Sequence, residues 1–180
     1  MGILLAFAPF IVFALVDRLF GPTLGLSAAA VTSVALLVRD WMSPKRKPKI
    51  LEIGTAILFG GLALYSLIGH PAWSLMGVRL RVDTGLLLLV VLTIVIRKPF
   101  TLQYAREEVS PEFWNTAEFV RVNYVISAVW ALAFVVIVIA DLIMVYAADF
   151  PSRYGVVISI LAIVGAMKFT SWYPGRTRNT

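Results

Sequence analysis

Residues 135–146 read VVIVIADLIMVY, a run in which one carboxylate, Asp141, stands among apolar and aromatic side chains. The run extends toward the N-terminus, so residues 118–147 form one long apolar segment. The hydrocarbon core of a bilayer takes roughly 20 residues of α-helix to cross. The stretch therefore predicts a helix in lipid, and it raises the question of which neighbours Asp141 has there.

The composition of the whole chain agrees with a lipid environment. Of the 180 residues, 60% are hydrophobic and 14% are charged, and the mean hydropathy is +0.89. Soluble domains carry about 25% charged residues. Cysteine is absent and His70 is the one histidine, which excludes thiolate chemistry and argues against zinc or haem ligation. We predict an integral membrane protein without a cofactor.

Six apolar segments follow one another along the chain. We predict an all-α polytopic transmembrane helix bundle with six membrane segments, alternatively five, in a single domain over residues 1–180. The first segment contains Pro9 and ends with Asp17 and Arg18, so it either spans the membrane or is re-entrant. The predicted segments are residues 3–20, 23–41, 50–69, 75–96, 118–147 and 154–172.

Basic residues are concentrated in alternate connections, most strongly in SPKRKPK at 43–49. Cytoplasmic loops of membrane proteins are enriched in Lys and Arg. This rule places the loop and the C-terminus on the cytoplasmic side, together with the N-terminus if all six segments span. Contact with anionic lipid headgroups is preferred to nucleic-acid binding, because no aromatic residues interleave with the charges. The four side chains predicted to make that contact are Lys45, Arg46, Lys47 and Lys49.

One face of the segment at 118–147 carries a stripe of residues that is polar or small at most positions. Ser127, Phe134 and Asp141 are seven apart and lie nearly in line on a helix, with Asn123 beside them. An aspartate at a helix centre costs about 2.5–3.5 kcal/mol on insertion scales, so the stripe is predicted to face other helices. Asp141 either pairs with an arginine near the outer interface, with Arg18 preferred, or lines an ion or substrate site.

No catalytic constellation is evident in the sequence. His70 has no serine-centred elbow or cysteine near it, and Glu107, Glu108 and Glu112 read as the charges of a solvated loop. We therefore predict no catalytic, cofactor-binding or metal-ligating residues and no enzyme activity. The polar positions singled out for function are Asp17, Arg18, Asn123, Ser127 and Asp141.

Several short motifs recur at familiar spacing. An F-x-P-x-x-V-F pattern covers residues 7–13, an F-G-G-L run covers 59–62, and a K-P-x-x-x-Q pattern covers 98–103. A further series is formed by Pro111, Trp114, Asn123, Trp130, Ala131 and Phe134. Together these motifs resemble the intracellular septation protein A family, small inner-membrane proteins of Gram-negative bacteria. Near Asp141 that family usually has an asparagine.

The resemblance implies a multi-pass protein of the bacterial inner membrane with a role in cell septation and envelope biogenesis. Its expected partners are membrane lipids and other membrane proteins of division or envelope growth, and a homo-oligomer is compatible with this reading. The family has no established enzyme activity, catalytic residue or cofactor. The expected function is thus a non-enzymatic interaction or scaffold role. The alternative is a small transporter or channel that uses the polar residues around Asp141, with Asn123 and Asp17.

Overall fold

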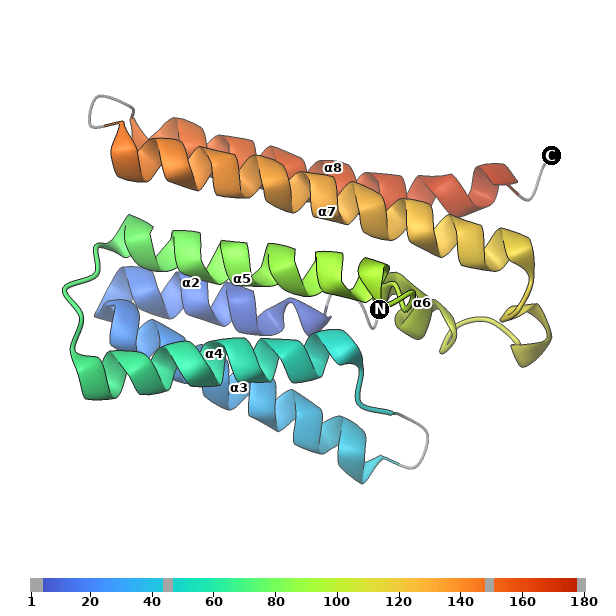
Figure 1. Ribbon diagram of the computed structural model, residues 1–180, viewed down its shortest axis with the longest axis horizontal. Coiled ribbons are helices and arrows are strands. Elements are labelled where there is room, and N and C mark those ends of the chain that lie inside the picture. The colour runs from blue at the N-terminus through green and yellow to red at the C-terminus, as the bar shows by residue number, and fades with distance from the viewer. Residues whose placement is uncertain (1–4, 44–46, 148–150, 178–180) are drawn as a thin grey trace. The chain divides into compact units, whose positions relative to one another are not determined.

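The computed structural model describes residues 5–43, 47–147 and 151–177, and the secondary structure within these ranges is helical, without a strand (Figure 1). The all-α prediction is confirmed for this part of the chain. By contacts the chain divides into two compact units, Met1–Leu89 and Val90–Thr180, so α5 contributes to both. The helices are α2 (Ala8–Phe20), α3 (Pro22–Met42), α4 (Ile50–Gly69), α5 (Leu75–Val95), α6 (Phe100–Ala105), the 3₁₀ turn η1 (Pro111–Phe113), α7 (Ala117–Tyr146) and α8 (Ser152–Thr177).

Four of the described helices are long and apolar enough to cross a membrane: α3, α4, α7 and α8. This supports the prediction of a membrane protein. Six crossings are not confirmed. The described part of α2 has 13 residues, and α5 has 21 residues but carries Arg79, Arg81 and Asp83 near its start. Whether α2 and α5 also cross, and whether both units form one membrane domain, stay predictions.

Local sequence explains where the helices begin and end. Only Gly21 separates α2 from α3, with φ of 91°, and Pro22 occupies the first turn of α3. This is the tight turn expected from a Gly-Pro pair. The hydroxyl of Thr116 caps α7 by accepting a hydrogen bond from the Phe119 amide at 3.3 Å. The helix thus begins one residue before the predicted segment at 118–147.

The first unit packs α2 against α3 and α3 against α4 around an apolar core. Phe59 of α4 is fully buried, and its ring lies 4.9 Å from that of Phe10 and 5.8 Å from that of Phe13. Between α4 and α5, leucine side chains pack over glycines, because Leu58 lies over Gly85 and Leu89 lies over Gly54. In lipid such van der Waals packing is a main force that holds helices together. The core residues are Phe13, Leu26, Ala29, Phe59, Ala63, Val78 and Val82.

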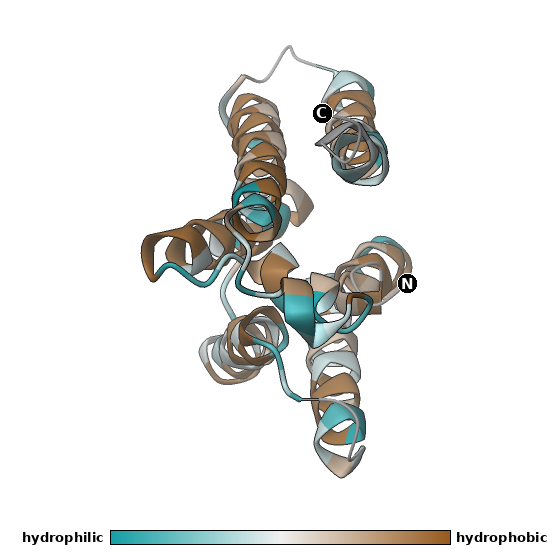
Figure 2. Cartoon of the chain, turned by 90° about the vertical axis from the view of Figure 1, so that its right-hand side faces the viewer, coloured by the Kyte–Doolittle hydropathy of each residue, from teal (hydrophilic) through white to brown (hydrophobic). Residues whose placement is uncertain are grey.

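The second unit is built on the pairing of α7 with α8, with α6 packed on α7 (Figure 1). Trp130 is its central side chain and is almost fully buried. Its indole Nε1 donates to Thr170 Oγ1 at 2.9 Å, and its ring meets that of Phe100 edge-on. Figure 2 shows the long helices coloured mainly as hydrophobic, with hydrophilic colour gathered near the connections between them.

Candidate functional site

A buried ionic cluster joins the end of α3 to the start of α4. Asp40 Oδ1 accepts from Arg39 at 2.8 Å (Nε) and 2.6 Å (Nη2), and Asp40 Oδ2 accepts from Lys49 Nζ at 3.2 Å. The same Nζ lies 3.5 Å from Glu52 Oε1, and the Lys49 amide donates to Glu52 Oε2 at 3.2 Å. Lys49 therefore bridges two carboxylates that come from different helices.

The burial of this cluster is nearly complete. The side chains of Asp40, Lys49 and Glu52 are 1%, 6% and 6% exposed, whereas that of Arg39 is 39% exposed. Two charges are wrongly placed for their own helix dipoles: the negative Asp40 at the C-terminal end of α3 and the positive Lys49 at the start of α4. Pairing them across the hairpin offsets both penalties. Glu52, in the first turn of α4, is favourably placed and completes a capping box with Lys49.

This cluster was not predicted from the sequence. The available signal was weak but present, because Asp40 and Glu52 are the only acidic residues between Asp17 and Asp83, and they flank the most basic loop of the chain. The structure places Lys49 inside the protein, with its charge engaged by Asp40 and Glu52, rather than toward headgroups.

Lys47 is exposed and able to meet a headgroup, so that part of the lipid prediction stays a prediction. Lys45 and Arg46 lie outside the described residues.

The predicted stripe on α7 is turned inward. Ser127, Phe134 and Asp141 are 0%, 2% and 0% exposed. Thr101 of α6 donates its hydroxyl proton to the Asn123 carbonyl at 2.8 Å, and its oxygen lies 2.8 Å from Ser127 Oγ. Because Thr101 has one proton, Ser127 is the donor in the second bond. Asn123 and Ser127 thus attach α6 to α7.

Thr101 was missed, although it lies within the K-P-x-x-x-Q motif. The Asn123 amide itself donates to the Phe119 carbonyl one turn earlier, at 2.9 Å. These bonds make Asn123 and Ser127 structural attachment points, whatever further role they have.

Asp17 and Arg18 have opposite surroundings. Asp17 is 2% exposed and Arg18 is exposed. Asp17 belongs to the first unit and Asp141 to the second, so the predicted pair between Arg18 and Asp141 stays a prediction. On α5, Arg79 is partly buried and directly follows Val78, a residue of the core that also contains Phe13 of α2.

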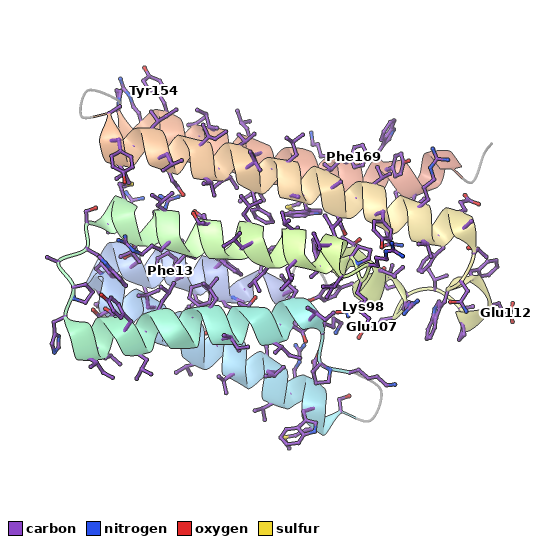
Figure 3. All side chains as sticks on the ribbon, viewed as in Figure 1. Phe13, Lys98, Glu107, Glu112, Tyr154 and Phe169 are labelled. Carbon is purple, nitrogen blue, oxygen red and sulfur yellow. The ribbon has the colours of Figure 1, made fainter. Side chains whose placement is uncertain are left out.

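Charged and polar side chains also mark the ends of the second unit. In Figure 3, Lys98, Glu107 and Glu112 lie at the end that contains α6 and η1, and Tyr154 lies at the other end. At the first of these ends the Arg106 guanidinium lies over the Trp114 ring, 5.6 Å from its centroid. Between the two ends, α7 exposes mainly apolar side chains such as Leu132 and Ile139. This distribution suits a helix pair with its two ends in water and its middle in lipid.

The chemistry that these groups offer is attachment and charge compensation. Among the described residues no three His, Cys, Asp or Glu side chains are grouped so that they could hold a metal ion. No family model, curated protein or solved structure matches the chain. The resemblance to the intracellular septation protein A family therefore stays a prediction from sequence motifs.

Proposed function

We propose that this chain is a multi-pass protein of the bacterial inner membrane that acts as a non-enzymatic scaffold in septation and envelope biogenesis. The observation that carries the proposal is that the F-G-G-L motif places its phenylalanine and its glycines on different faces of α4. Phe59 is buried in the core of the first unit, whereas an ideal Cβ at Gly60 or Gly61 would meet nothing within 4 Å. The motif therefore anchors α4 on one side and leaves a glycine notch on its outer face.

The rest of that outer face is apolar. Ile57 is 70% exposed and Leu64 is 59% exposed, on either side of the notch. In lipid, small residues between larger ones allow the backbone of a second helix to approach closely. A transmembrane helix of a division or envelope protein is the proposed occupant, which agrees with the partners that the family resemblance implies.

Buried polar groups elsewhere support a scaffold because many of them join helices. Thr23 Oγ1 and Ser66 Oγ lie 2.7 Å apart and connect α3 with α4. Trp130 is bonded to Thr170 across α7 and α8, and the Lys49 bridge closes the hairpin between α3 and α4. Helices held in this way present their outer faces in a constant arrangement within each unit.

Site-specific photo-crosslinking in living cells tests the proposal. A photoreactive amino acid at position 61 is expected to capture an identified membrane protein of division or envelope synthesis. The matched control is position 165 on α8, where a side chain also meets nothing within 4 Å. Capture of lipid alone, or equal capture from both positions, would contradict the scaffold role.

A small transporter or channel is the second proposal, and the buried carboxylates of Asp17 and Asp141 favour it. Ionisable groups inside membrane bundles commonly mark ion or substrate paths. Purified protein in liposomes is then expected to carry a proton or solute flux that Asp141→Asn abolishes. Equal flux through the wild type and this variant would remove Asp141 from any transport path.

A further inference from the structure

Asp17 is held tightly between α2 and α3. Its backbone carbonyl accepts from the Gly21 amide at 3.0 Å, at the turn between the two helices. On α3, an ideal Cβ at Gly25 would come within 2.8 Å of Asp17 Cβ and 2.9 Å of Asp17 Cα. The backbone of α3 therefore lies directly against the backbone and Cβ of Asp17.

One oxygen of this carboxylate lacks a donor. Asp17 Oδ1 is buried and accepts no hydrogen bond in the described structure. One turn earlier on the same face, Phe13 belongs to the apolar core. A buried ionised carboxylate with an oxygen that lacks a donor is costly, and such a group is neutralised by a counter-charge or by a proton.

The available counter-charge for Asp17 is on α5. Arg79, on α5, is partly buried and directly follows Val78, which shares the core of the first unit with Phe13 of α2. No ion pair joins Arg79 to Asp17 within the described residues. Arg81, two residues later, is engaged elsewhere, because its guanidinium lies over the Trp73 ring at 4.7 Å and donates to the Gly77 carbonyl at 2.6 Å. The other charged or titratable groups at this end are Arg18 on α2, Tyr65 and His70 at the end of α4, and Asp83 on α5; among its described residues α3 has none here.

The nearby hydroxyls do not complete a metal site. Thr23 and Ser66 bond to each other, and among the described residues no three His or acidic side chains are placed so that they could hold a metal ion. A Ca²⁺ or Mg²⁺ ion takes six or more oxygen ligands, counting waters. A proton needs a single oxygen and no added volume.

We propose that Asp17 Oδ1 is a proton-binding site whose charge state controls the attraction between α2 and Arg79. Protonation forms one O–H bond with a proton taken from water at this end of the first unit, and it leaves the carboxyl neutral. Loss of that proton restores the negative charge and draws the Arg79 guanidinium toward α2. The ligand is thus the proton, and the responding element is the start of α5. This site does not rest on the scaffold role and would hold for a transporter as well.

Infrared difference spectroscopy on the full chain in zwitterionic nanodiscs tests the proposal, because protonated carboxyl groups absorb apart from carboxylates. A pH-dependent carboxylic acid band is expected in the wild type and in Glu118→Gln, which removes an exposed carboxylate. The band is expected to lose one component in Asp17→Asn. An unchanged band in a folded Asp17→Asn protein would overturn the proposal.

The arginines supply an independent readout should Asp17→Asn fail to fold. Arg79→Gln removes a charge that favours the ionised form, so the midpoint of the band's titration is expected to rise. Arg18→Gln is the matched control, since this neighbouring arginine is exposed, and it is expected to leave the midpoint in place. Equal midpoints in the two arginine variants would show that Arg79 does not control Asp17 and would overturn the coupling.

Discussion

Replacing Lys49 by methionine tests whether the ionic cluster holds the hairpin between α3 and α4. Methionine has a similar length and keeps the packing of the aliphatic stem, but it removes the ammonium that lies 3.2 Å from Asp40 and 3.5 Å from Glu52. Both carboxylates are nearly fully buried. The variant therefore leaves two negative charges facing the same vacated position.

The expected loss of stability depends on the hydrogen bonds that each carboxylate retains in the variant. Breaking a buried ion pair by removing one partner costs about 3–5 kcal/mol. Asp40 retains its two bonds from Arg39, and Glu52 retains the bond from the Lys49 amide. The expected loss therefore lies at the lower end, about 3 kcal/mol in the free energy of unfolding.

The assay is a denaturation titration in detergent micelles, followed by tryptophan fluorescence and circular dichroism. Lys47→Met is the matched control, because Lys47 lies in the same loop and is exposed; a change within about 0.5 kcal/mol is expected. Adding Glu52→Gln to the Lys49→Met variant should recover stability, since it removes one of the two uncompensated charges. A Lys49→Met protein as stable as Lys47→Met would refute the reasoning.

Three further outcomes are expected from the same assay. Gly25→Ala should lower the free energy of unfolding by about 1–3 kcal/mol, because its new methyl group would meet the backbone of Asp17. Gly61→Ala is the control, since its methyl group meets nothing within 4 Å and the change should be neutral. Similar values for the two variants would contradict the close approach of α2 and α3. Thr101→Val should lower the free energy of unfolding by roughly 0.6–2 kcal/mol. A double-mutant cycle with Ser127→Ala should reveal coupling between the two hydroxyls, and a cycle without coupling would argue against their hydrogen bond. His70→Gly should raise the free energy of unfolding by about 1 kcal/mol, because His70 ends α4 in the left-handed region, with φ of 41° and ψ of 47°, which glycine adopts without strain. His70→Ala keeps that strain and serves as the control. An equal effect of both substitutions would exclude the backbone conformation as the cause.

The topology is tested separately by cysteine labelling. The chain has no native cysteine, so Ser43→Cys reports on a single position. In intact cells it should resist a membrane-impermeant thiol reagent added from outside. Labelling of Ser43→Cys under those conditions would show that the basic loop is not cytoplasmic.

Much of the helical framework could be predicted from local sequence. The Gly21-Pro22 pair marked the turn between α2 and α3 because both residues act on backbone geometry within a few positions. The seven-residue spacing of Ser127, Phe134 and Asp141 predicted one buried face, since helical periodicity alone decides which side chains point the same way. Length and hydropathy were sufficient to indicate the spans α3, α4, α7 and α8.

The partners of the polar side chains were decided by tertiary structure. Lys49 was predicted to face lipid headgroups, but its flexible stem reaches inward because the hairpin brings Asp40 and Glu52 together from positions on either side of the loop. The sequence does not tell whether Gly60 and Gly61 lie against another helix. The structure shows that a side chain at either position would meet nothing within 4 Å, while the neighbouring Phe59 is buried in the core. Sequence periodicity determines which residues share a face of a helix, whereas the element that covers that face depends on contacts between segments distant in the chain.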